Sequence, residues 1–178
     1  MSMAECTPKV PSRLILLRHA KSDYPAGVVD HDRPLNDRGR RDAAAAGEWV
    51  QEHYDELFDG EIMVLVSSAH RAQETWSLVG DRLEGIAART EPRIYEAAVS
   101  TLITLAAECS ADTVLIVGHN PSIEETAIFL AKPDGRGLIE RLRGKYPTCG
   151  LTVLDLSDAD PWSSHSADLA AFEIPRAH

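Results

Sequence analysis

Four side chains suited to binding and transferring a phosphoryl group follow three apolar runs of the sequence. They are Arg18 and His19 after residues 14–17, Arg71 after residues 62–66, and His119 after residues 113–118. The planar guanidinium of arginine matches phosphate oxygens with two parallel, charge-assisted hydrogen bonds. A neutral imidazole is a competent nucleophile, and covalent capture of the phosphoryl group splits hydrolysis into two easier steps. These residue types therefore favour phosphoryl transfer through a histidine.

The four residues suggest distinct roles. His19 is the candidate nucleophile. The charge on the phosphoryl oxygens would be stabilised by Arg18, Arg71 and His119, and losing one such donor typically costs on the order of 100- to 1000-fold in rate. Arg71 is expected in the first turn of a helix, where a cation opposes the helix dipole unless an anion shares the site. A metal hydrolase is disfavoured, because zinc sites need convergent ligands with little competing positive charge.

Strands that end at one edge of a sheet must position these side chains. The apolar runs indicate buried strands over residues 14–17, 62–67, 113–118 and 151–156, with helical patterns between them. This alternation predicts a three-layer α/β/α fold with a mainly parallel central sheet and helices on both faces. The carboxyl ends of parallel strands share one edge, where ligands bind in such folds. We therefore expect the arginines and histidines to meet there.

Local signals set the expected bounds of the other elements. Three helices have candidate N-caps at Asn36, Ser100 and Asn120, the last with Pro121 at the first helical position. The Asn36 helix should end near residue 54 and the Asn120 helix near residue 131. The remaining expectations are a helix with the apolar stripe 72, 76, 79 and 83, a short strand over 92–95, a short helix over 138–143, and a surface loop over 157–168.

The composition is that of an ordinary globular protein with an acidic surface. The chain has 178 residues, 44% of them hydrophobic, and a net charge of −10, which argues against nucleic acid or a membrane as the main partner. We expect residues 1–12 to be a flexible N-terminal segment and residues 13–178 to form a single domain. No run has signal-peptide or membrane-span character, which predicts a cytoplasmic protein. The three widely spaced cysteines support neither a disulfide framework nor a zinc motif.

Three stretches together resemble the histidine phosphatase superfamily, which is also called phosphoglycerate mutase-like. They are Leu-Arg-His-Ala at 17–20, Ser-Ser-Ala-His-Arg-Ala-Gln-Glu-Thr at 67–75 and Gly-His-Asn-Pro at 118–121. Asp-Arg-Pro-Leu-Asn at 32–36 and Pro-Arg at 175–176 are similar to its small bacterial branch, the SixA phosphohistidine phosphatases. Ala20 departs from the Gly of the wider superfamily but is usual in this branch, and Ser68 stands where many members have Pro.

The resemblance implies that His19 is phosphorylated and that neither a metal nor a cofactor is required. Arg18 and Arg71 then clamp the phosphate, and His119 completes the pocket. Glu96 falls near the position where larger members keep a proton donor. Imidazole, with a reference pKa of about 6.5, leaves more easily than an alkoxide, so a phosphohistidine substrate would make Glu96 dispensable. Further candidates to bind phosphate or substrate are Asn120, Lys21 and Arg33.

The leading hypothesis is a metal-independent phosphatase that dephosphorylates phosphohistidine on a protein. The short loop over residues 21–34 leaves little room for the capping insertions that larger relatives place around small metabolites. One alternative is a phosphatase of a small phosphomonoester, which should need Glu96 as an acid. Another is a phosphate-binding module without turnover, which the presence of all four core residues disfavours. In each case a phosphate or sulfate ion could occupy the pocket.

Overall fold

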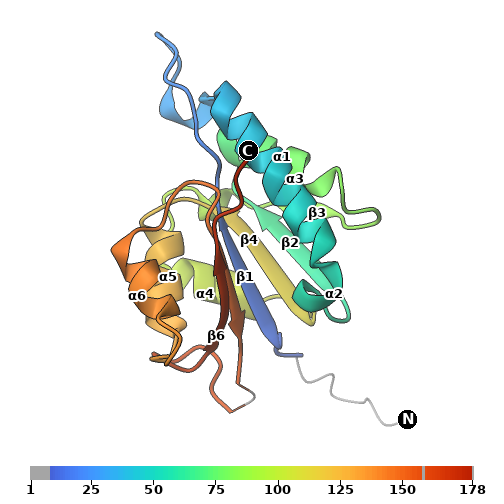
Figure 1. The fold of residues 1–178 in the computed structure, drawn as a ribbon, viewed down its shortest axis with the longest axis vertical. Coiled ribbons are helices and arrows are strands. Elements are labelled where there is room, and N and C mark those ends of the chain that lie inside the picture. Colours follow the sequence, from blue (N-terminus) through green and yellow to red (C-terminus); the bar gives the residue numbers. More distant parts are fainter. Residues whose placement is uncertain (1–8, 158, 178) are drawn as a thin grey trace, which may run out of the picture.

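The structure is a computed structural model that describes residues 9–157 and 159–177. In this part of the chain one sheet has the strand order β3-β2-β4-β1-β5-β6 (Figure 1). The strands are β1 (Arg13–Arg18), β2 (Ile62–Val66), β3 (Ala88–Thr90), β4 (Thr113–Gly118), β5 (Leu151–Asp155) and β6 (Asp168–Glu173). All pairs among β1 to β4 are parallel, and β5 runs antiparallel to both β1 and β6. The predicted, mainly parallel sheet is confirmed, with one reversed strand.

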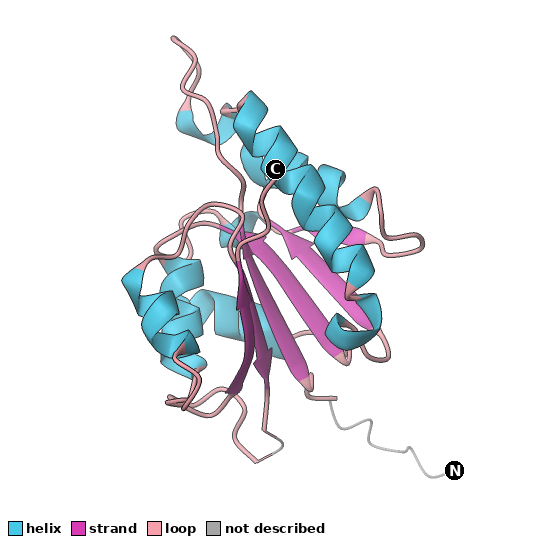
Figure 2. Cartoon of the chain, viewed as in Figure 1, coloured by secondary structure: helices cyan, strands magenta, loops and turns pink. Residues whose placement is uncertain are grey.

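Helices cover both faces of the sheet, as predicted (Figure 2). One face carries α1 (Asp37–Glu52) and α3 (His70–Gly80), and the other carries α4 (Val99–Ala107), α5 (Ser122–Leu130) and α6 (Leu138–Gly144). A short α2 (Tyr54–Leu57) follows α1. Within the described residues, no helix combines the length and apolar composition needed to cross a membrane. Of the predicted N-terminal segment, residues 1–8 lie outside the described residues.

The strand β1 shows how the sheet builds a core on each face. Leu14 and Leu16 pack into the cluster formed with α4, α5 and α6, whereas Ile15 and Leu17 pack into the cluster formed with α1 and α3. All four side chains are fully buried. Alternate side chains of a strand point to opposite faces, so a strand covered on both faces reads as one continuous apolar run. This packing fixes the ends of β1 and β4, and with them the residues that follow.

Two predicted helix starts and one predicted strand were wrong. The stretch predicted as a strand over 92–95 contains the 3-10 helix η2 (Pro92–Ile94), and the strand β3 lies just before it. Proline fits a helix start because its missing N–H has no partner there anyway. The α4 helix has Ala98 rather than Ser100 at its N-cap. The α4 helix therefore begins at Val99, two residues before the start that a Ser100 cap predicts, and no side chain caps it.

The start of α5 and the last strand also differ from the expectations. The Asn120–Pro121 peptide bond is cis, and α5 begins at Ser122, so Asn120 is not the N-cap. Its side-chain amide instead donates to Glu124 Oε2 at 2.7 Å. The strand β6 was not predicted, and it begins at Asp168, the last residue of the expected surface loop over 157–168. Antiparallel pairing with β5 at the edge of the sheet gives this segment its structure.

Residues 21–36, which we call the strap, connect β1 to α1 and extend beyond the strand ends (Figure 1). The strap contains the 3-10 helix η1 (Asp30–Asp32). Asn36 caps α1, as predicted, by accepting from the Gly39 N–H at 2.8 Å. A Cβ atom on Gly39 would lie 2.0 Å from the Lys21 carbonyl oxygen. Only glycine therefore allows the strap to pack this closely on α1.

Candidate active site

His19 follows β1, and its backbone is held from two sides. Its N–H donates to the Gly118 carbonyl at 3.0 Å, and the Cys149 N–H donates to the carbonyls of Arg18 and His19 at 3.1 and 3.2 Å. The ring atom Nδ1 lies 2.7 Å from the Ala20 carbonyl oxygen. Because a carbonyl oxygen can only accept, Nδ1 carries the ring proton and Nε2 keeps its lone pair. This tautomer leaves Nε2 able to attack an electrophile.

Burial keeps the two site histidines uncharged at neutral pH. His19 is 8% exposed, and loss of solvation, followed by the neighbouring His119, lowers its pKa to about 3. Burial is also the main reason that the pKa of His119 is lowered to about 4, with Arg71 as the next cause. A buried imidazole avoids the desolvation cost of the charged form by staying neutral. The site therefore contains two neutral imidazoles beside cationic guanidinium groups.

His119, which follows β4, lies beside His19, with 5.0 Å between the ring centroids. Its Nε2 is 2.8 Å from the Ser67 Oγ, which also accepts from the Ala69 N–H. The Ser67 hydroxyl can donate its proton to Nε2, which leaves Nδ1 as the protonated ring nitrogen. That Nδ1 atom is buried and has no hydrogen-bond partner among the described residues. It is a donor available to a ligand.

Arg18, the last residue of β1, is positioned by the loop that precedes β5. Its Nη1 donates to the Tyr146 carbonyl at 2.6 Å. The Tyr146 ring is held in turn, because its hydroxyl donates to the Leu16 carbonyl at 2.9 Å. Burial lowers the pKa of the Arg18 guanidinium, and its Nε is buried without a partner in the described part of the chain. Part of the Arg18 guanidinium thus remains available to bind an anion.

Arg71 lies in the first turn of α3, as predicted, and its counter-ion is Asp30 of the strap. Its Nη1 donates to the Asp30 carbonyl at 2.6 Å, and its Nη2 donates to Asp30 Oδ2 at 3.0 Å. The same carboxylate accepts from Arg33 at 2.7 Å and from the Tyr95 hydroxyl at 2.8 Å. These donors, Arg33 first and Tyr95 next, lower the pKa of Asp30 to about 2. Asp30 is therefore ionised.

The other predicted site residues surround the four central side chains. Lys21 has an exposed side chain on the strap, and Arg33 stacks on the Tyr24 ring at 3.4 Å while it contacts Asp30. Asn120 donates to the Tyr146 carbonyl at 3.3 Å in addition to Glu124. Glu96 is exposed, has a left-handed backbone with φ of 59°, and makes no side-chain hydrogen bond among the described residues. The roles predicted for these residues stay predictions.

Three residues of the site were not anticipated from the sequence: Asp30, Ser67 and Tyr95. Tyr95 packs edge-on against His119, with 5.7 Å between the ring centroids, and lies 5.9 Å from the Arg71 guanidinium carbon. A signal for Asp30 existed, since it lies among charged residues in the loop that directly follows His19. The sequence carries no comparable signal for Tyr95, because its place depends on how η2 packs under the strap.

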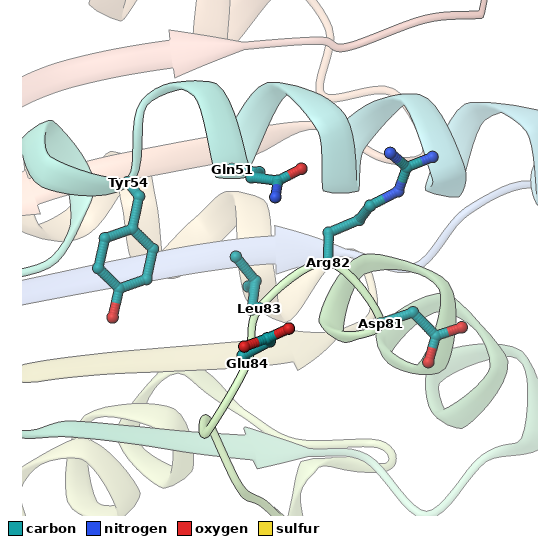
Figure 3. Close-up of a pocket in the computed structure, with 6 residues that line it drawn as sticks. All are labelled: Gln51, Tyr54, Asp81, Arg82, Leu83 and Glu84. Carbon is teal, nitrogen blue, oxygen red and sulfur yellow. The ribbon is translucent and has the colours of Figure 1, made fainter.

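Figure 3 shows a pocket that none of these site residues lines. It lies where α1 and α3 end, and it is lined by Gln51, Tyr54, Asp81, Arg82, Leu83 and Glu84. Arg71 is at the opposite end of α3, an 11-residue helix about 16 Å long. In the part of the chain that the structure describes, no group of three His, Cys, Asp or Glu side chains is arranged to hold a metal ion. The strand ends therefore define the candidate site.

A mainly parallel sheet with helices on both faces brings two arginines and two histidines together at one edge. Residues 14–102 match the model of the histidine phosphatase superfamily, branch 1, and the chain belongs to this superfamily. Membership implies a phosphatase activity. An uncharacterized protein of Mycobacterium tuberculosis is 38% identical over 168 residues, which cover 90% of this chain and 100% of that protein.

Solved structures show the same fold. The structure of a proposed phosphohistidine phosphatase SixA from Agrobacterium tumefaciens has a TM-score of 0.76 and 29% identity, and the match covers 94% of this chain and 100% of that one. A protein histidine phosphatase SixA in complex with tungstate has a TM-score of 0.70 and 21% identity, with 92% and 97% of the two chains covered. The resemblance noted in the sequence is confirmed at the level of family and fold.

Proposed function

We propose that this chain is a metal-independent phosphatase that forms a phosphohistidine intermediate on His19 and acts on phosphohistidine of a protein. The observation that carries the proposal is the neutral His19 ring, whose Nδ1 proton is held by the Ala20 carbonyl and whose Nε2 has no hydrogen-bond partner among the described residues. Arg18, Arg71 and His119 lie around this ring. A nucleophile with donors preorganised around it is what phosphoryl transfer requires.

In the first step, the His19 Nε2 attacks phosphorus, a new N–P bond forms, and the bond between phosphorus and the leaving group breaks. The three equatorial oxygens gain charge in the transition state. Arg18 and Arg71 stabilise these oxygens, and the unpartnered Nδ1–H of His119 donates to one of them. With a phosphohistidine substrate, the leaving imidazole takes a proton from solvent and departs as a neutral ring.

In the second step, a water molecule attacks the phosphorus of phospho-His19. The N–P bond breaks, its electron pair returns to the His19 Nε2, and inorganic phosphate and a proton are released. The hydrogen bond from Nδ1 to the Ala20 carbonyl keeps the ring in one orientation through both steps. The enzyme thereby returns to its starting tautomer without a net change in the protein.

The position of Glu96 supports phosphohistidine over a phosphate ester as the substrate. An alkoxide leaving group needs an acid in hydrogen-bond reach, whereas imidazole is a far better leaving group. Glu96 is exposed, and no contact among the described residues orients its carboxylate. The SixA names of the structural relatives and the tungstate bound by one of them agree with a site for phosphohistidine and phosphate-like anions. A cytoplasmic location stays a prediction.

The test is turnover in the presence of a chelator, with a phosphohistidine peptide and an aryl phosphate as the two substrates. We expect His19→Ala to abolish both activities and Glu96→Gln to keep cleavage of the P–N bond within about twofold of the wild type. His70→Ala is the matched control, because His70 precedes Arg71 but is exposed. If Glu96→Gln abolishes turnover of both substrates, or only the aryl ester is cleaved, a small phosphomonoester is the substrate instead.

A further inference from the structure

We propose that Asp30 competes with phosphate for Arg71, and that this competition weakens the binding of inorganic phosphate so that the product leaves the site. The inference goes beyond the proposed function, since it concerns any phosphoryl group that uses Arg71. It makes Asp30 a positioning residue that acts through the guanidinium.

Asp30 accepts hydrogen bonds from both terminal nitrogens of Arg71, as a phosphate would. The backbone carbonyl oxygen of Asp30 accepts from Nη1 at 2.6 Å, and its carboxylate oxygen Oδ2 accepts from Nη2 at 3.0 Å. These two nitrogens form the fork with which arginine binds phosphate bidentately. A guanidinium has five N–H groups, so a phosphate can either share Arg71 with Asp30 or replace it. Either arrangement places the phosphate oxygens beside the carboxylate.

Separate contacts keep Asp30 at the mouth of the site when Arg71 turns to a ligand. Arg33 holds Oδ1 at 2.7 Å and the Tyr95 hydroxyl donates to Oδ2 at 2.8 Å. The Asp30 side chain is 54% exposed, whereas that of Arg71 is 8% exposed. The carboxylate thus sits at the entrance and the guanidinium lies inside. A displaced Asp30 stays close enough to bind Arg71 again as soon as phosphate moves out.

The charge of Asp30 explains why a phosphatase would retain such a contact. Arg71 is buried and Arg18 is half-buried, and a phosphate dianion in hydrogen bonds with both would dissociate slowly. An ionised carboxylate beside that dianion raises the free energy of the bound phosphate, because like charges at short range repel each other. In the empty site the same carboxylate neutralises Arg71. Asp30 therefore lowers the free energy of the site without phosphate and raises the free energy of the phosphate complex.

The test is the dissociation constant of inorganic phosphate, measured by titration calorimetry at pH 7 and fixed salt. We expect Asp30→Asn to bind phosphate at least tenfold more tightly than the wild type, with a matching fall in the constant for competitive inhibition by phosphate. Asp32→Asn is the matched control, because it removes the same charge from the same 3-10 helix, and Asp32 contacts His31 rather than an arginine. This control should change the constant by less than twofold.

The direction in which the phosphate dissociation constant changes shows whether Asp30 competes with phosphate for Arg71 or holds Arg71 in place for it. If Asp30 merely holds Arg71 in place, Asp30→Asn will bind phosphate more weakly, and if it is a bystander the constant will not change; either result overturns the proposal. Asp30→Ser serves as a second variant should the Asn protein not fold. The measurement needs no turnover, so it remains readable even if phosphohistidine proves not to be the substrate.

Discussion

The His19 ring should remain neutral, with its proton on Nδ1, far below the pH at which an ordinary histidine is charged. With its pKa lowered to about 3 by burial, about 1% of the ring is protonated at pH 5. A histidine with the reference pKa of about 6.5 would be about 97% protonated at that pH. The nucleophile would then be lost in an ordinary site and fully available in this one, a difference of about 30-fold in the neutral form.

The assay is nitrogen-detected NMR of protein labelled with ¹⁵N-histidine, recorded between pH 8 and 4.5. His19→Gln assigns the resonances by removing them. We expect one protonated nitrogen, Nδ1, and one unprotonated nitrogen, Nε2, with no titration step above pH 5. A midpoint between 6 and 7 would refute the burial argument, and a proton on Nε2 would refute the tautomer. Bound phosphate should move the midpoint upward, because an anion beside the ring favours its charged form.

Three further predictions concern the site and its support. Arg71→Lys should lower kcat/KM for an aryl phosphate by on the order of 100-fold, because lysine keeps the charge but loses the fork; steady-state kinetics measures this. Gly39→Ala should cost about 1–3 kcal/mol in urea unfolding, since its Cβ would lie 2.0 Å from the Lys21 carbonyl oxygen, whereas Gly144→Ala, with nothing within 4 Å, should be neutral or slightly stabilising. The free energy of unfolding should fall as the pH falls from 6.5 towards 4, because His19 binds a proton in the unfolded chain but stays unprotonated in the native protein. His19 alone contributes on the order of 2 kcal/mol of this loss between pH 6.5 and 5, and His19→Gln should reduce the slope.

Much of the sheet could be predicted because burial on both faces leaves a plain signal. The strands β1, β2 and β4 are apolar runs, and the side chains that follow them are placed by chain direction alone. The strand β3 carries no such signal, since all its residues are exposed. The strand β6 mixes buried and exposed positions along an irregular edge with a register shift in its pairing. Its structure comes from the neighbouring strand rather than from its own pattern.

Some residues of the site could also be predicted from the sequence, whereas others could not. Arg18, His19 and His119 lie at or next to the ends of buried strands, so their meeting point follows from topology. Asp30 begins the 3-10 helix η1 of the strap and Tyr95 directly follows the 3-10 helix η2, so their meeting depends on how the strap folds over α3. Long loops are placed by contacts distant in sequence, such as that of Gly39 with Lys21. A single sequence does not reveal such contacts.

Cys149, whose N–H donates to the backbone at His19, can report local opening of the structure around the nucleophile. The Cys149 thiol is fully buried, and burial raises its pKa to about 12, so an alkylating reagent can reach it only when β1 and the loop before β5 separate. Cys109, also buried, lies before β4 at the other end of the sheet. Labelling at Cys149 that is faster than at Cys109 would measure how often the catalytic edge opens while the rest of the sheet stays closed. A ligand that bridges Arg18 and Arg71 should slow the alkylation of Cys149 and leave the alkylation rate of Cys109 unchanged.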